Sequence, residues 1–463
     1  MAKIIIKNFR AIDYAEIEIK PFTVIIGEQA SGKSTISKLV YFFKEISLEL
    51  IKTLTNYMSH NSSFSNVKFE DFDFKLIQKE CLELLKIDLK LKFNEYFNST
   101  QKEHFHITFI DSNYLVTIKP DNKISIVIDF AENPFVHNII DKSLSKFKIY
   151  LEELLGIDLG PNLSLEELEK GLKNKKSFKI PRISNSKFFF IPASRSLITT
   201  ILPASQSKFI AEIDKRAEDN QIDYFVKTFL EDIDYFKRNY FFGKSLDEVI
   251  DEFELKTSKE NPKAKQLRDK IKTILKADYQ NGSSGEQLVD KRFLKPVSLD
   301  KASSGQQEVV WILLTLLSLV LEDNKSFVVI EEPEAHLYPK TQAQVVEYIA
   351  QFFNAKEGNE MIITTHSPYI LTVLNNLLFA KQISDKTHGV ENQAIAESID
   401  PQAWLDIDKF SAYYVGRNEQ GQFIKSIINP ETGLISVNAL DDASDDIMDT
   451  FDNLMDIYKS AAV

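Results

Sequence analysis

The hydrophobic positions of this chain predict alternating strands and helices near its two ends. A β-branched and aromatic run at 22–26 is typical of a strand, and it is followed by apolar residues at helical spacing, namely Ile36, Leu39, Val40 and Phe43. The continuous apolar run at 327–330 is typical of a parallel strand covered on both faces, and residues 361–365 predict a second buried strand. This pattern predicts an α/β fold in which helices flank a mixed sheet.

The longest apolar run extends from Val309 to Leu321. It is shorter than the roughly 20 residues that a membrane helix needs, so we expect a helix buried behind the sheet and no membrane anchor. No signal peptide is recognisable after Met1, and the single cysteine, Cys81, excludes a disulfide framework and a zinc hook. These features predict a cytoplasmic protein.

The region between the two ends has a different pattern. Helical spacing recurs at 76–93 and 139–155, with strand-like runs at 106–109 and 124–128 between them. No heptad repeat is sustained, which excludes a long coiled-coil arm. We therefore predict an inserted arm domain of mixed α+β and helical character. Further charged helices are expected at 209–275.

The most specific motif lies between the first predicted strand and helix. Gly27-Glu28-Gln29-Ala30-Ser31-Gly32-Lys33-Ser34 matches the G-x-x-x-x-G-K-[ST] phosphate loop, whose backbone N–H groups face phosphates while its lysine reaches the β and γ oxygens. The helix start aims its positive dipole end at the same anion. Residues Gly27 to Thr35 are therefore predicted to bind the nucleotide, with Lys33 acting on the phosphates and the Ser34 hydroxyl binding Mg²⁺.

Two later segments are short and rich in serine and glycine. Ala302-Ser303-Ser304-Gly305-Gln306, here called the signature segment, precedes the long apolar run. Ser283-Ser284-Gly285-Glu286-Gln287 looks similar but leads into a short mixed stretch, which predicts a hairpin with Asn281-Gly282 at its turn. We therefore interpret the second segment as a decoy.

Two predicted strands end in ionisable residues. The run at 327–330 ends in Glu331 and Glu332, and the run at 361–365 ends at His366. Between them lies Glu334-Ala335-His336-Leu337-Tyr338-Pro339. Carboxylates at the end of a buried strand are exposed to a ligand, and their order after the phosphate loop is that of a nucleotide hydrolase.

With these motifs the chain resembles the ABC-type ATPase heads of the SMC, RecF and OLD group, over about 1–45 and 187–440. The resemblance implies ATP and Mg²⁺ as cofactors and a head that dimerises around two nucleotides. Ser303, Ser304, Gly305 and Gln306 would cap the γ-phosphate held by the opposite protomer. Glu331 would hold Mg²⁺, Glu332 would be the general base, and His366 would sense the γ-phosphate.

The resemblance also sets the expected domains. We predict a head part with the phosphate loop at 1–45, the arm at 46–186, a head strand and helical lobe at 187–278, the rest of the head at 279–400, and a C-terminal hairpin and acidic helix at 401–463. The glutamine that links Mg²⁺ to the arm is not placed. Residues 188–195 resemble a strand-Pro-Ala-x-Arg element of the short bacterial relatives in this group. Arg195, the arginine of that element, is expected either near the nucleotide edge or in a plain structural turn.

Net charge bears on the partners. With 56 basic and 68 acidic residues the chain carries −12, which argues against a surface coated with nucleic-acid contacts. Two basic clusters, 170–187 and 256–276, leave contact with DNA or RNA open, although most charge runs are solvated helix faces. The first Asp cluster, Asp406 and Asp408, and the second, at 441–446, are weak nuclease candidates.

Short heads of this kind resemble the ATPase subunits of bacterial anti-phage systems such as Septu and PARIS, which act with a separate nuclease or toxin. The sequence therefore predicts an ATPase that forms a homodimer or higher even oligomer and controls a separate effector. A RecF-like DNA-repair ATPase is the alternative, and an OLD-like nuclease is a third interpretation. Resemblance of fold alone does not choose among them.

Overall fold

The fold is taken from a computed structural model of the 463-residue chain. It describes residues 2–60, 74–97, 104–111, 115–120, 126–130, 186–193, 195, 223–282, 285–290, 295–416 and 423–436. The predicted helix at 139–155, most of the basic cluster at 170–187 and the acidic segment at 441–446 lie outside these residues. By contact, the chain forms two compact units, residues 1–19 with 35–188 and residues 20–34 with 189–463. The five predicted domain boundaries stay a prediction.

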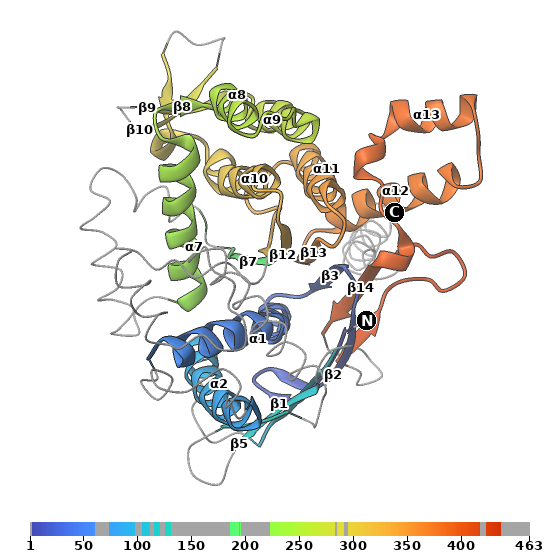
Figure 1. The fold of residues 1–463 in the computed structure, drawn as a ribbon. Helices are drawn as coiled ribbons and strands as arrows, with labels where there is room; N and C mark the ends of the chain where they lie inside the picture. Colours follow the sequence, from blue (N-terminus) through green and yellow to red (C-terminus); the bar gives the residue numbers. More distant parts are fainter. Residues whose placement is uncertain are drawn as a thin grey trace, which may run out of the picture. The chain divides into compact units, whose positions relative to one another are not determined.

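The first unit is built on an antiparallel sheet in the order β2-β1-β4-β5-β6 (Figure 1). Its strands are β1 (Ala2–Phe9), β2 (Ile12–Ile19), β4 (His106–Ile110), β5 (Leu115–Pro120) and β6 (Ile126–Phe130). Its helices are α1 (Lys33–His60), which starts in the second unit, and α2 (Phe74–Phe97). Aromatic rings fill its core, including the stacked pair Phe43 and Phe109, with centroids 4.9 Å apart.

The second unit contains a six-stranded sheet in the order β15-β14-β3-β13-β12-β7. The strands are β3 (Phe22–Gly27), β7 (Ser186–Ile191), β12 (Lys325–Glu331), β13 (Glu360–Thr365), β14 (Phe410–Val415) and β15 (Ile424–Ser426). β3 pairs in parallel with both β13 and β14, and β12 pairs in parallel with β13. The carboxyl ends of these parallel strands therefore meet at one edge of the sheet.

Six helices of the described residues pack apolar side chains with this sheet into one hydrophobic core (Figure 1). They are α7 (Tyr224–Phe236), α8 (Leu246–Thr257), α9 (Pro262–Leu275), α10 (Ser304–Leu321), α11 (Pro339–Ala355) and α12 (Pro368–Ser384). A further helix, α13 (Val390–Ser398), has no buried residue. By length and composition α10 could cross a membrane, yet 78% of it is buried inside the protein, as expected of a core helix.

A smaller sheet in the order β11-β10-β9-β8 lies beside these helices in sequence and space. It comprises β8 (Lys244–Ser245), β9 (Asp278–Gly282), β10 (Gly285–Val289) and β11 (Val297–Ser298). β9 and β10 form the hairpin predicted for the decoy, with Gly282 paired to Gly285. Asn281 and Gly282 therefore lie in β9 and not at the predicted turn, and Gly285 to Gln287 of the decoy lie in β10.

The predicted pattern of elements is largely confirmed. The strand at 22–26, the helix after the phosphate loop, the buried strands at 327–330 and 361–365, and the helix at 76–93 are all present. The α/β fold with a mixed sheet and flanking helices is confirmed by the strand order and pairing. The C-terminal hairpin is also present, but its first strand, β14, is a parallel member of the main sheet, which the sequence did not predict.

Candidate functional site

The predicted phosphate loop joins β3 to α1 at the carboxyl edge of the main sheet. β3 ends at Gly27 and α1 begins at Lys33. Between them the backbone takes left-handed conformations at Ala30, with φ 61°, and at Gly32, with φ 101°. Such conformations turn successive N–H groups toward one side of a loop, which is the arrangement that binds an anion.

Gly27 is fixed by the neighbouring strand. A Cβ atom at this position would lie 2.0 Å from the main-chain oxygen of Val415, the residue of β14 that pairs with Gly27. That distance leaves no room for any side chain. The first glycine of the motif is therefore required by the close approach of β14 as well as by the loop.

Lys33 is directed back into its own loop. Its Nζ donates to the main-chain oxygens of Gly27 and Glu28, at 2.9 and 2.6 Å, and its side chain is almost fully buried. Burial lowers the pKa of Lys33, an effect opposed by the charges of Glu332, Glu334 and Glu331. The lysine therefore lies beside a cluster of carboxylates.

The three predicted catalytic side chains form a chain of contacts. Nδ1 of His366 lies 3.4 Å from Nζ of Lys33, and its Nε2 lies 2.9 Å from Oε1 of Glu332. Lys33 is the first residue of α1, His366 directly follows β13, and Glu332 directly follows β12. The three residues therefore meet at the carboxyl edge of the sheet. In the tautomer with a proton on Nε2, His366 donates to the Glu332 carboxylate.

The backbone at Glu332 is unusual for a residue with a side chain. Its φ is 45°, in the left-handed region, and its N–H donates to the main-chain oxygen of Thr364 at 2.8 Å. Pro333 follows it. A strained conformation of this kind persists only where surrounding contacts determine it, and such conformations cluster at functional sites.

The sequence interpretation did not assign a role to Glu334. Its Oε1 accepts hydrogen bonds from the Thr365 hydroxyl and from the His366 N–H, both at 2.7 Å. It thereby ties the segment after β12 to the end of β13 and fixes the backbone that carries His366. The available signal was a third glutamate in a Glu-Glu-Pro-Glu run directly after a buried strand.

The residues predicted to bind Mg²⁺ offer suitable oxygen donors. Ser34, exposed in the first turn of α1, has a hydroxyl, and Glu331, buried at the end of β12, has a carboxylate. Hydroxyl and carboxylate oxygens are hard ligands of the type that Mg²⁺ takes when it also binds phosphate. This donor set fits the ion.

The signature segment forms the N-terminus of α10. Ser303 caps the helix in a capping box with Gln306, whose side-chain amide also donates to the Leu275 oxygen at 2.7 Å. Ser303 and Ser304 are exposed, so the start of α10 is open to solvent, while the Ser303 hydroxyl is engaged with Gln306 in the capping box. Gly305 is required for packing because a Cβ there would lie 2.8 Å from the His336 oxygen.

Arg195 is fully buried behind the acidic strand end. Its guanidinium donates to the main-chain oxygens of Pro192, Glu331 and Glu332, at 2.7, 2.5 and 2.8 Å. Nε lies 3.4 Å from Oε2 of Glu308, a buried carboxylate of α10 that the sequence interpretation missed. Burial lowers the pKa of Arg195, and Glu308 opposes this most strongly. Arg195 thus lies beside the acidic strand end and binds its backbone.

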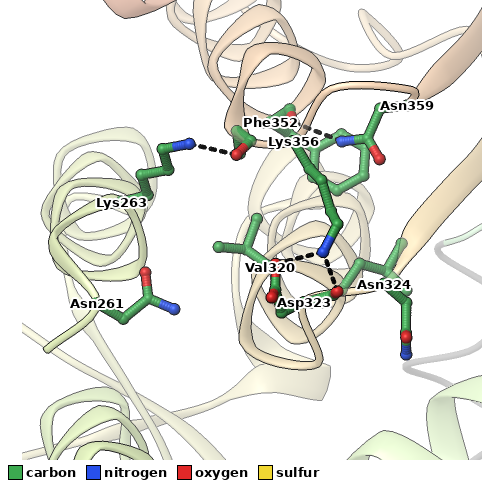
Figure 2. A pocket seen from close by; sticks show the side chains of 10 residues that line it. Asn261, Lys263, Val320, Asp323, Asn324, Phe352, Lys356 and Asn359 are labelled. Carbon is green, nitrogen blue, oxygen red and sulfur yellow. Dashed lines mark hydrogen bonds and ion pairs between the residues drawn. The ribbon is translucent and has the colours of Figure 1, made fainter. Parts of the chain in front are cut away.

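A separate cavity lies at the opposite edge of the sheet. It has a volume of about 110 Å³, and Asn324 and Asn359, which precede the starts of β12 and β13, line it (Figure 2). Its two lysines are engaged, because Lys356 binds Asp323 at 2.6 Å and Lys263 donates to the Ala355 oxygen. The cavity therefore lies at the opposite end of the strands from the acidic residues, and it is not part of the candidate site.

The basic cluster at 256–276 is largely paired. Lys256, Lys265 and Lys270 bind Glu252, Glu254 and Glu347, while Arg268 and Lys272 share Asp247. Paired cations offer little free charge to a phosphate backbone, so this cluster is a solvated face of α8 and α9. Asp406 of the first nuclease candidate caps a short helical turn by accepting from the Asp408 N–H.

A model of the family described as AAA ATPase domain matches residues 1–371, a range that includes the phosphate loop, the signature segment, both strand ends and His366. The chain belongs to the AAA ATPase domain family. The predicted membership of an ATPase class is therefore confirmed. Among the residues that the structure describes, no group of three or more His, Cys, Asp or Glu side chains is arranged to hold a metal ion by itself.

This AAA ATPase is also similar to solved SMC heads. An SMC head bound to the C-winged helix domain of ScpA is 12% identical, with a TM-score of 0.35 and coverage of 80% of this chain and 90% of that one. The SMC head domain from Thermotoga maritima is 9% identical, with a TM-score of 0.33 and coverage of 92% and 98%. A head with an extended coiled coil, bound to the C-terminal domain of ScpA derived from Pyrococcus furiosus, is 13% identical, with a TM-score of 0.32 and coverage of 81% and 92%.

Proposed function

We propose that this AAA ATPase binds ATP with Mg²⁺ and hydrolyses it at the carboxyl edge of the main sheet. The observation that supports this most directly is the contact chain from Lys33 through His366 to Glu332. It joins the residue that would hold the phosphates to the residue that would orient the attacking water. Mg²⁺, held by Ser34 and Glu331, would neutralise charge on the phosphate oxygens.

We further propose that two copies complete each site. The support is the exposed start of α10, where Ser303 and Ser304 lie at the positive end of a helix dipole. Such a helix start stabilises charge that develops on phosphoryl oxygens. In this proposal it would cap the γ-phosphate bound by the phosphate loop of a second copy, so that ATP holds a homodimer together.

The biological role proposed for the ATPase is control of a separate effector, a nuclease or a toxin, in the cytoplasm of a bacterium defending itself against phage. This part of the proposal is supported by the resemblance of the motifs to stand-alone heads of anti-phage systems. ATP turnover would then set the time for which the dimer presents one conformation to that effector.

Glu332→Gln tests the proposed chemistry. A glutamine keeps the size of the side chain but cannot accept a proton, so ATP turnover should fall by about 10²- to 10⁴-fold while ATP still binds. The variant should also accumulate as a dimer with ATP, measured by light scattering. Glu357→Gln, which changes an exposed glutamate next to Gly358, is the matched control and should behave as the unaltered protein. Unchanged phosphate release by Glu332→Gln would reject the proposal.

A further inference from the structure

The turn that carries Glu332, the proposed general base, is held by the buried side chain of Arg195. Arg195 donates to the carbonyl oxygens of Glu331 and Glu332, so two successive peptide groups bind the same guanidinium. Arg195 has no exposed surface, and it also donates to Pro192 within its own turn. A planar guanidinium has several N–H donors in fixed directions and can bind these main-chain oxygens at once, whereas a lysine ammonium cannot reproduce that forked geometry.

This contact coincides with the strained residue. Glu332 has a φ of 45°, and the oxygen bound by Nη2 of Arg195 is its own carbonyl. A non-glycine residue in the left-handed region costs of order 1–3 kcal/mol unless its surroundings hold it. The guanidinium and the Thr364 oxygen, which accepts from the Glu332 N–H, hold the two sides of this residue. The direction of its carboxylate toward His366 depends on that conformation.

The same arginine reaches the signature helix. Nε of Arg195 donates to the Glu308 main-chain oxygen at 3.2 Å and lies 3.4 Å from the Glu308 carboxylate. Glu308 is in α10, one turn after the signature segment, and its other oxygen lies 3.7 Å from Nδ1 of His336. A buried charge pair of this kind tolerates little separation, because moving one partner leaves the other uncompensated.

We propose that Arg195 is a positioning residue that holds Glu332 in its working backbone conformation and, through Glu308, couples that conformation to the position of the signature helix. This inference rests on the proposed function. In this proposal, a displacement of α10 moves the residues that cap the nucleotide of the second copy. Through Glu308 and Arg195, the same displacement also moves Glu332, the base beside the nucleotide of the first copy. The two ATP sites of a dimer then communicate through Arg195 and Glu308.

Arg195→Lys tests the first half of the proposal. It keeps a positive charge near Glu308 but loses the fork that binds two carbonyls. We expect kcat to fall by about 10- to 100-fold, as for a misplaced catalytic group, while the Kd for a fluorescent ATP analogue stays within about 3-fold. Arg268→Lys is the matched control, since Arg268 is an ion-paired arginine of α9, and its kcat should be unchanged.

A second comparison separates positioning from general damage. If Arg195 acts through Glu332, adding Arg195→Lys to the Glu332→Gln variant should change the residual single-turnover rate by less than about 2-fold. A further loss equal to that seen in the unaltered background would overturn the proposal. If the unaltered protein does not hydrolyse ATP, the proposed function itself is rejected. If the unaltered protein is active and Arg195→Lys has the same kcat, only this inference is rejected.

Glu308→Gln tests the coupling to α10 and decides the matter if Arg195→Lys does not fold. Glutamine keeps the shape and one acceptor oxygen but removes the buried charge that faces Arg195. We expect kcat to fall by roughly 3- to 10-fold with little change in the Kd for ATP, because the base and the loop themselves are intact. A kcat equal to that of the unaltered protein would overturn the proposal.

Discussion

Two charge-dense regions of the second unit differ in how they handle their charges. At the carboxyl edge of the main sheet, Glu331, Glu332 and Glu334 gather around the buried Lys33, and burial lowers the pKa of that lysine. On α8 and α9, basic side chains, most of them on α9, pair with carboxylates, most of them on α8. Both regions look like charge runs in the sequence, but only the first concentrates charge of one sign.

The difference shows what a charge cluster must contain to indicate a site. Like charges held close together repel each other and require buried donors such as Arg195 and the Thr365 hydroxyl to hold them. Opposite charges on an exposed helix face need no such support, and each pair contributes little. We therefore expect substitutions at the sheet edge to have large effects and substitutions on α8 and α9 to have small ones.

Gly27→Ala should have the largest effect. The added Cβ would meet the Val415 oxygen at 2.0 Å, a main-chain atom that cannot move without disturbing β14, so the free energy of unfolding should fall by about 3 kcal/mol. Urea denaturation measures it. The matched control is Gly282→Ala in β9, where nothing lies within 4 Å of the added atom and the change should be within about 0.5 kcal/mol. Equal losses in both variants would contradict the comparison.

Lys33→Met should separate function from stability. Loss of a charged donor to the phosphates should weaken ATP binding by about 10- to 100-fold. Because burial already disfavours the charge of Lys33, its removal should not lower the free energy of unfolding. Titration with a fluorescent nucleotide and urea denaturation measure the two quantities. A variant that loses stability but binds ATP normally would show that Lys33 is structural.

Lys272→Ala should have a small effect on stability. It removes partners of Asp247 and Asp278, at 2.7 and 3.2 Å, on a partly exposed surface, so the free energy of unfolding should fall by only about 0–1 kcal/mol. Screening should reduce the difference further in 1 M salt. ATP turnover should be unchanged, and a loss of turnover would mean that α9 takes part in the chemistry.

Substitution of Glu252 should give the smallest effect, and that effect should disappear in acid. Lys244 and Lys256 lower its pKa to about 2 from 4.5, so its pairing stabilises the fold above about pH 4.5. The stabilisation is lost progressively as the pH falls from 4.5 toward 2, because the carboxylate must then be protonated. Glu252→Gln should lower the free energy of unfolding slightly at pH 7 to 9, and this difference from the unaltered protein should disappear as the pH falls from 4.5 toward 2. A difference that grows as the pH falls through that window would contradict the assignment.

The sequence predicted the parts of the fold that depend on local pattern. The phosphate loop, the acidic strand end and the strand before His366 each combine a buried run with a short motif, and each lies where predicted. The decoy was separated from the signature segment by the residues that follow it, since a hairpin and a long apolar helix need different patterns.

The contacts that the sequence did not predict join residues far apart along the chain. Gly27 and Val415 become neighbours only through the pairing of β3 with β14, and the local sequence around neither residue indicates its partner. Arg195 and Glu308 are also distant in sequence, and nothing in the sequence around a glutamate near the start of an apolar helix indicates its partner. For the same reason the lysines of α9 could not be paired with Glu254 or Asp247 before the structure was known.

The placement of β14 beside β3 also constrains how the protein is made. The strand that leads into the phosphate loop is synthesised among the first 30 residues, yet its two neighbours in the sheet are residues 360–365 and 410–415. A nascent chain must therefore keep an apolar strand unpaired while almost the whole polypeptide emerges from the ribosome. Such non-local parallel pairing folds slowly. Interrupted translation products of this protein should consequently lack a formed nucleotide pocket and should be prone to aggregation.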